Sequence, residues 1–324
     1  MASSKLVCVT GAGGFIASWL VKHLLLEGYV VRGTLRDPEN PKNAHLKELE
    51  GAKERLSLYK ADLMNYGSLC NAFKGCDGVF HVASPVSNDP NLVPVAIEGT
   101  KNVVNAAADM SVRRIVFTSS YGAVHMDPNR SPDKVLDETC WSDTEFCKKT
   151  KNWYCYAKTL AEKSAMAEAK KRGVQLLVVV PPMTLGPALS QGLHLSANHL
   201  IRYMTAGTKR AIPNAVAGYI DVRDVARTHE LVYKSPKASG RYLCIGYVMH
   251  RLELINLLKE LFPHYPFSKR DEHDETPMVK PYKFSNQRIK DLGLRFTPIK
   301  ETLSDTVISL QEKGHLPIYT FSKL

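Results

Sequence analysis

The first junction of the chain constrains its fold most. The run Lys5–Thr10 is apolar and rich in valine after its first residue, as in a buried strand, and the glycine-rich turn Gly11–Gly14 follows it directly. The next segment, Phe15–Glu27, has the apolar spacing of a helix and stops at Gly28. A strand that runs through glycines straight into a helix is typical of the first βα unit of a parallel sheet.

The same alternation continues through the first half of the chain. Further strands are predicted at the apolar runs Tyr29–Leu35, Arg55–Lys60, Gly78–Ala83, Arg114–Ser119 and Gln175–Val180. Helical spacing lies between them at Tyr66–Lys74, Val93–Met110 and Tyr154–Arg172. Strands this continuously apolar are covered on both faces. The sequence therefore predicts an α/β fold with a doubly wound parallel sheet of the Rossmann type, built from right-handed βαβ units.

The pattern changes after Pro181-Pro182, where loops rich in Pro, Gly and Asn separate shorter elements. The later elements are predicted at Val222–Tyr233 (helix), Gly240–Ile245 (strand), Leu252–Leu261 (helix) and Lys300–Lys313 (helix). We therefore expect a dinucleotide-binding domain over residues 1–182. Residues 183–324 are expected to form a smaller, mainly substrate-binding lobe, with roughly residues 215–248 returning to the Rossmann sheet.

The charge balance indicates anionic partners. Lys and Arg number 43 against 32 for Asp and Glu, a formal net charge of +11. The basic residues are spread along the chain, and the densest cluster is Lys148, Lys149 and Lys151. Because no nucleic-acid motif accompanies the charge, we expect phosphorylated small molecules as partners and no nucleic acid.

Cysteine usage and the chain ends bear on the compartment. Seven cysteines in no C-x-x-C pattern predict free thiols and no metal site, which favours the cytosol. Cys147 and Cys155 are too far apart for a disulfide, at about 12 Å, unless the stretch before Asn152 is non-helical. We expect neither a secretory signal nor a membrane partner. The C-terminal Ser322-Lys323-Leu324 matches a peroxisomal address, which is the alternative location.

The glycine turn has the layout of a dinucleotide site. Gly11 permits the tight turn, and Gly14 lets the backbone approach a pyrophosphate at the helix N-terminus, where unpaired N–H groups attract anions. The predicted cofactor contacts of the turn are Gly11, Gly13, Gly14, Phe15 and Ile16. After the third strand, Asp62 and Leu63 are expected beside the adenine, although Asp62 also fits a turn or helix cap.

The end of the second strand favours NADP over NAD. An NAD site has a carboxylate there for the ribose 2′-OH, and this chain has Leu35 followed by Arg36. A guanidinium binds a 2′-phosphate through charge-assisted hydrogen bonds, and Lys42 is expected to add a second contact. Asp37, one residue further on, keeps NAD as the alternative.

A Tyr-x-x-x-Lys pair suggests the chemistry. Tyr154 and Lys158 share one helix face at this spacing, whereas Tyr156 faces elsewhere. The ammonium is expected to lower the phenol pKa and to hold the nicotinamide ribose, so both residues count as cofactor contacts. Ser120, at the end of a strand, is expected to donate a hydrogen bond to a substrate carbonyl, with Ser119 as its competitor.

Together these residues resemble the extended short-chain dehydrogenase/reductases, and most closely the plant cinnamoyl-CoA reductases and their dihydroflavonol-reductase relatives. Three passages carry the resemblance: Val9–Trp19, Arg32–Arg36 and Lys151–Lys158. The last is similar to the signature Lys-Asn-Trp-Tyr-Cys-Tyr-Gly-Lys, with Ala157 in place of the glycine. The resemblance covers nearly the whole chain. It implies reduction of hydroxycinnamoyl-CoA thioesters by NADPH to hydroxycinnamaldehydes, with release of CoA and with Ser120, Tyr154 and Lys158 as catalytic residues.

The resemblance also implies substrate contacts at Thr184, His199, Arg202 and Arg251. Arg202 departs from the family pattern, which has Lys there; the charge is kept, but the geometry of the donors differs. Two alternatives remain open. One is a ketone or aldehyde reductase such as a dihydroflavonol reductase, and the other, of a different class, is a non-catalytic NADPH-sensing protein.

Overall fold

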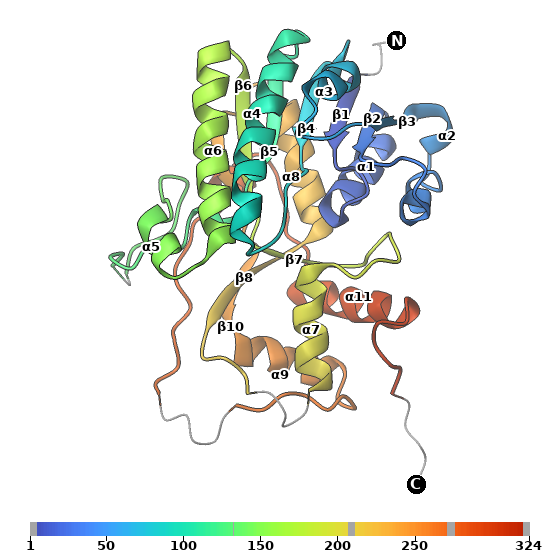
Figure 1. The fold of residues 1–324 in the computed structure, drawn as a ribbon. Helices are drawn as coiled ribbons and strands as arrows, with labels where there is room; N and C mark the ends of the chain where they lie inside the picture. The colour runs from blue at the N-terminus through green and yellow to red at the C-terminus, as the bar shows by residue number, and fades with distance from the viewer. Residues whose placement is uncertain (1–4, 132, 207–210, 271–275, 320–324) are drawn as a thin grey trace.

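Seven parallel strands form the central sheet in the order β3-β2-β1-β4-β5-β6-β9 (Figure 1). A computed structural model describes residues 5–131, 133–206, 211–270 and 276–319, so Ser322–Leu324 lies outside it. The strands are β1 (Leu6–Thr10), β2 (Val30–Leu35), β3 (Leu56–Lys60), β4 (Gly78–His81), β5 (Arg114–Thr118), β6 (Gln175–Val180) and β9 (Gly240–Leu243). The order reverses between β1 and β4, which confirms the predicted Rossmann-type doubly wound sheet.

Helices cover both faces of this sheet (Figure 1). One face carries α1 (Phe15–Leu26) and α8 (Val222–Lys234), and the other carries α3 (Tyr66–Phe73), α4 (Val93–Asp109) and α6 (Trp153–Arg172). The short helices η1 (Pro41–Leu46), α2 (Ala52–Arg55), η2 (Pro90–Leu92), η3 (Tyr121–Ala123), α5 (Thr144–Lys149) and α10 (Gln287–Asp291) lie in the connections. None of the described helices has the length and unbroken apolar character that a bilayer crossing requires.

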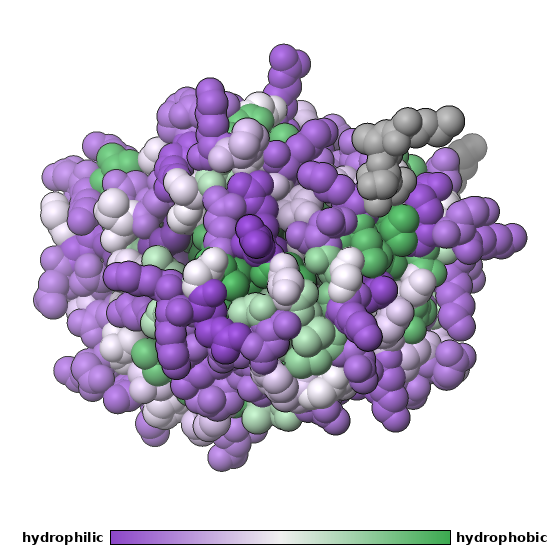
Figure 2. Space-filling view, turned by 90° about the horizontal axis from the view of Figure 1, so that it is seen from above, coloured by the Kyte–Doolittle hydropathy of each residue, from purple (hydrophilic) through white to green (hydrophobic). Residues whose placement is uncertain are grey.

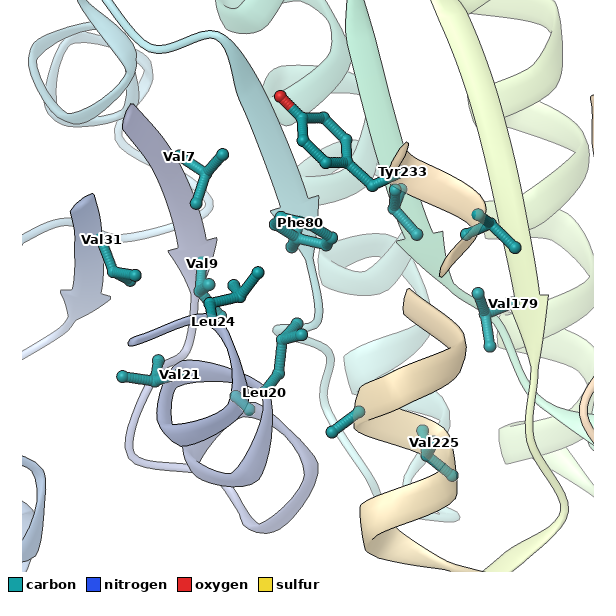
Figure 3. Close-up of a cluster of buried hydrophobic side chains, with 14 of the residues drawn as sticks. Val7, Val9, Leu20, Val21, Leu24, Val31, Phe80, Val179, Val225 and Tyr233 are labelled. Atoms are coloured by element: carbon teal, nitrogen blue, oxygen red, sulfur yellow. The ribbon is translucent and has the colours of Figure 1, made fainter. Parts of the chain in front are cut away.

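The core beneath α1 and α8 explains why the first unit folds as predicted. Figure 3 shows Val9 of β1, Leu20 and Leu24 of α1, Phe80 of β4 and Val225 of α8 gathered between the layers. All five side chains are fully buried. Removing one such side chain from water stabilises the fold by about 1.5–3 kcal/mol, so the strand and helix patterns in the sequence are enforced by packing.

A second, three-stranded sheet lies below the first in Figure 1, in the order β10-β8-β7. Its strands are β7 (Met183–Leu185), β8 (Val216–Asp221) and β10 (Tyr247–His250), and α7 (Leu195–Thr205), α9 (Arg251–Leu261) and α11 (Ile299–Glu312) pack around it. The segment expected to return to the Rossmann sheet is therefore divided: β9 joins the main sheet, whereas β8 and β10 do not. Pro181-Pro182 lacks the amide hydrogens that would extend the pairing of β6, so the chain leaves the main sheet there.

The helix that carries the Tyr-x-x-x-Lys pair, α6, is separate from the short helix α5 that precedes it. A non-helical stretch separates α5 from α6, and Lys151 within it has a positive φ of 53°. Cys147 and Cys155 therefore lie on two helices, so the separation expected for one continuous helix does not apply to them. Both are buried, and both are free thiols.

The face of the Rossmann domain that points away from the smaller lobe is mostly hydrophilic. Figure 2, which views the molecule from above, shows its hydrophobic side chains in small areas among hydrophilic ones. Small hydrophobic areas of this kind are ordinary on a protein surface and do not by themselves indicate a binding face.

Candidate active site

The turn between β1 and α1 is built to receive an anion. Gly11 has a φ of +67°, and its amide carbonyl accepts from the N–H of Gly14 at 2.9 Å. Gly14 is the N-cap of α1 and provides no side-chain cap, and the first turn of this helix contains no acid. The first N–H groups of a helix, here those of Phe15 and Ile16, have no intrahelical acceptor. A cofactor pyrophosphate therefore fits this turn in both shape and charge.

Gly13 has a neighbour that the sequence analysis missed. A Cβ added at Gly13 would lie 2.2 Å from Oδ1 of Asn43, a buried residue of η1. Asn43 is held in place because its Nδ2 donates to the Asp37 carbonyl at 2.9 Å. No local pattern marks Asn43, since η1 brings it against the turn only in the folded chain.

The carboxyl end of β2 presents a cation. Arg36 directly follows the buried Leu35 and is exposed, a placement that fits a 2′-phosphate, and Lys42 is exposed on η1. Asp37 is used locally: its Oδ1 accepts from the Glu39 N–H at 3.2 Å. These observations support the NADP prediction over its NAD alternative.

The adenine prediction concerns Asp62 and Leu63. Asp62 is exposed, and its Oδ1 accepts from the Met64 N–H at 2.8 Å, which is the turn role considered as the alternative. The Leu63 side chain lies against the backbone of α4, where a Cβ added at Gly99 would approach it to 2.8 Å. The structure thus places Leu63 against α4 and Asp62 in the exposed turn that precedes α3.

Ser120 and Tyr154 meet at the carboxyl end of β5. Ser120 caps η3, and its Oγ accepts from the Gly122 N–H at 3.0 Å. The Ser120 hydroxyl also forms a hydrogen bond with the Tyr154 phenol, which lowers the phenol pKa, but burial has the larger effect and raises it. On the other side, the Tyr154 N–H donates to Oδ1 of Asn88 at 3.2 Å, which fixes the start of α6.

Lys158 lies one turn further along α6 and is only 3% exposed. Its Nζ donates to the Thr118 carbonyl at 2.8 Å and lies 5.0 Å from the centroid of the Phe117 ring. Burial lowers the pKa of Lys158 to about 8, and the carboxylate of Glu162 opposes this shift.

The expected effect of Lys158 on Tyr154 was wrong for this structure. The pKa of Tyr154 lies above its ordinary value because burial outweighs the other influences, and the charge of Lys158 is not among the influences on it. The ammonium is instead engaged by the Thr118 carbonyl.

The neighbouring candidates are engaged elsewhere. The hydroxyl of Ser119, which directly follows β5, donates to the carboxylate of Glu162, so it is not available to the Tyr154 phenol. Tyr156 packs edge-on against Trp153 at 6.0 Å between ring centroids and lies beneath the ammonium of Lys148. The structure thus brings together Ser120, not Ser119, with Tyr154, not Tyr156.

The four predicted substrate contacts lie in the smaller lobe. Thr184 in β7 is buried and donates to the Pro182 carbonyl at 3.2 Å. Arg251, at the start of α9, lies with one Nη1 atom 2.7 Å from the Tyr203 hydroxyl and 3.5 Å from Nδ1 of His199. Arg202 on α7 is exposed. The structure thus brings His199 and Arg251 together and leaves Arg202 at the surface.

A surface cavity of about 490 Å³ lies apart from these residues, between α1, α8 and the segment Arg295–Glu301. Two of its cations are already paired, Arg223 with Asp221 at 2.7 Å and Arg227 with Asp224. None of the predicted catalytic residues lines it. We therefore do not assign the reaction to this cavity.

Comparisons with known proteins agree with this geometry. Residues 7–246 match the NAD dependent epimerase/dehydratase family. The chain is 68% identical to cinnamoyl-CoA reductase 1 of Oryza sativa subsp. japonica, over 97% of this chain and 93% of the rice protein. Among solved structures it is similar to vestitone reductase from alfalfa (31% identity, TM-score 0.84, covering 96% of this chain and 99% of that one). It is also similar to yeast methylglyoxal/isovaleraldehyde reductase complexed with NADPH (29% identity, TM-score 0.80, covering 96% and 100%). The chain therefore belongs to the NAD dependent epimerase/dehydratase family, and within it to the cinnamoyl-CoA reductases.

Proposed function

We propose that this protein reduces hydroxycinnamoyl-CoA thioesters to hydroxycinnamaldehydes with NADPH and releases CoA, a step of phenylpropanoid and lignin metabolism. The observation that carries the proposal is the hydrogen bond between the Ser120 hydroxyl and the Tyr154 phenol, with the buried Lys158 one turn further on. This pair of donors lies at the carboxyl end of the same parallel sheet as the anion-binding turn of α1.

The residues have distinct roles in the proposed reaction. When bound, NADPH supplies the hydride that reaches the thioester carbonyl carbon. Ser120 and Tyr154 donate hydrogen bonds to the carbonyl oxygen as its negative charge develops, and Tyr154 then transfers its proton to that oxygen as the general acid. In this proposal the ammonium of Lys158 holds the nicotinamide ribose, which orients the cofactor for the transfer. Collapse of the hemithioacetal breaks the C–S bond, so that the aldehyde and the CoA thiol leave.

The smaller lobe supplies the contacts for the substrate in this proposal. The guanidinium of Arg251, oriented by Tyr203, is suited to a CoA phosphate, and His199 lies beside it. Arg202, being exposed on α7, is proposed to meet the CoA moiety from the solvent side. Thr184, buried in β7, is proposed to line the acyl pocket.

The proposal is tested by following NADPH absorbance and free thiol together, with feruloyl-CoA, 4-coumaroyl-CoA and dihydroquercetin as parallel substrates. We expect oxidation of NADPH with equal release of thiol for the thioesters. Oxidation with dihydroquercetin alone supports the second candidate, a ketone reductase, which the similarity to vestitone reductase favours. NADPH binding without turnover of any substrate contradicts both and leaves the sensing role.

We also propose a cytosolic location, which the seven free thiols support. A fluorescent protein fused to the N-terminus leaves the terminal Ser-Lys-Leu available. Diffuse cytosolic signal is the expected result, and peroxisomal puncta that vanish when the tripeptide is removed contradict it.

A further inference from the structure

A buried carboxylate, that of Glu162, lies on the same helix as Tyr154 and Lys158. Glu162 follows Lys158 by one turn on α6 and is 0% exposed. Both of its oxygens have partners: Nε of Arg241 donates to Oε1 at 2.6 Å, and the Ser119 hydroxyl donates to Oε2. A carboxylate buried this completely costs free energy unless its charge has a partner, so its position needs an explanation.

The arginine that pairs with it is fixed by the surrounding backbone. Arg241 lies on β9, the edge strand of the main sheet, and is itself buried. Its Nη1 donates to the carbonyls of Glu138 and Cys140 at 2.8 and 2.7 Å, and its guanidinium stacks on Trp141 at 3.9 Å. Arg241 therefore connects α6, β9 and the segment before α5.

Glu162 touches the reaction machinery through two neighbours. Ser119, which it holds, immediately precedes Ser120. Lys158 is the other, because the negative charge of Glu162 raises the pKa of this buried ammonium against the effect of burial.

The other ionisable groups around this ammonium carry no opposing charge. His81 of β4 and His229 of α8 are fully buried, and His229 forms a hydrogen bond with Thr118. Burial lowers the pKa of His81 to about 3 and that of His229 to about 4, so both are neutral. Tyr154 precedes Lys158 on α6 and is neutral as the proton donor. Arg241 lies beyond Glu162 and is not among the charges that shift the pKa of Lys158. Among the described residues, Glu162 is therefore the acid that balances the charge of Lys158.

We infer that Glu162 is a positioning residue for the reduction: it holds the strand end that carries Ser120 and supplies the buried counter-charge one helical turn from Lys158. This inference rests on the proposed function, since it assigns Glu162 to the same site.

The test compares the pH dependence of kcat for the wild-type protein and Glu162→Gln, with feruloyl-CoA and saturating NADPH. Loss of the negative charge lets Lys158 lose its proton more easily. The alkaline limb of the kcat profile is therefore expected to move to lower pH by about one unit, with activity largely recovered at acidic pH. If Glu162 has only a structural role, the substitution lowers kcat by the same factor at every pH, and the alkaline limb of the profile stays where it is. That result overturns the inference.

Two further variants keep the test decisive. The control is Glu230→Gln. It removes another buried carboxylate, on α8, which accepts from the Tyr29 hydroxyl at 3.4 Å, and it should leave the alkaline limb of the kcat profile unchanged. If Glu162→Gln does not fold because Arg241 is left unpaired, Glu162→Gln with Arg241→Met removes that cation, and the same shift is expected. Failure of the proposed function is seen in the wild type alone, as absence of thioester turnover. The pH comparison is then made with whichever carbonyl substrate the wild type reduces.

Discussion

The ring of Phe15 stacks on the imidazole of His194, with 3.6 Å between ring centroids and 8° between ring planes. Phe15 is the first residue of α1 at the anion-binding turn, and His194 is the N-cap of α7 in the smaller lobe. A second contact links α1 to the smaller lobe: Nε1 of Trp19 donates to the Pro187 carbonyl at 2.7 Å. The cofactor turn and the smaller lobe are therefore joined directly at the point where NADPH would bind.

This stack predicts that His194→Ala weakens NADPH binding. An aromatic pair contributes about 1 kcal/mol beyond burial, so the Kd for NADPH should rise roughly fivefold. His194→Phe keeps a ring there and should bind nearly as the wild type does. Quenching of protein fluorescence by NADPH measures both values, and equal Kd values for wild type and His194→Ala would show that the stack does not support the cofactor.

Three histidines, of which His81 and His229 are fully buried and His194 is partly buried, predict a loss of stability in acid. Burial lowers the pKa of His81 to about 3, and it lowers those of His194 and His229 to about 4. All three are neutral in the folded and the unfolded chain above the ordinary pKa of about 6.5. As the pH falls below that value the unfolded chain takes up protons first, so the free energy of unfolding should fall between about pH 6.5 and 4.

Thermal unfolding across this range measures the effect. His229→Gln should flatten the pH dependence, because it removes one of the three protonation sites, while it lowers the Tm at neutral pH by weakening the bond to Thr118. A Tm of the wild type that stays constant from pH 7 to 4 would contradict this assignment.

Tyr154→Phe is predicted to remove turnover while leaving cofactor binding intact. Loss of the general acid should lower kcat by at least about 100-fold. The matched variant is Tyr156→Phe, whose ring packs on Trp153 away from Ser120 and whose kcat should stay close to that of the wild type. Steady-state kinetics with an NADPH titration separates the two effects, and substantial activity in Tyr154→Phe would assign the proton to another group.

Arg36→Ala is predicted to change the choice of cofactor. A charge-assisted bond to the 2′-phosphate contributes about 1.5–3 kcal/mol, so kcat/KM for NADPH should fall by about 10- to 100-fold while the value for NADH changes little. Lys42, exposed on η1, is the second predicted contact, so Lys42→Ala should have a smaller effect in the same direction. The ratio of the two kcat/KM values is the measurement, and an unchanged ratio would place the 2′-phosphate elsewhere.

The elements that the sequence predicted well are those set by local rules. The turn Gly11–Gly14 and the Tyr154–Lys158 spacing depend on residues next to one another or on one helix face, so their geometry can be read before the fold is known. The strands β7, β8 and β10 were not predicted, because they lie outside the regular alternation of apolar strands and amphipathic helices and are stabilised mainly by their pairing with one another.

The sequence by itself determined the Rossmann frame, the cofactor turn and the helix that carries Tyr154 and Lys158, because apolar periodicity and glycine conformation act over a few residues. Only the tertiary structure decided which side chains complete the site. Glu162 meets Arg241, Phe15 meets His194 and Arg251 meets His199 across long stretches of chain. Such contacts depend on how whole layers pack, since no local pattern encodes the distance between two residues on separate elements.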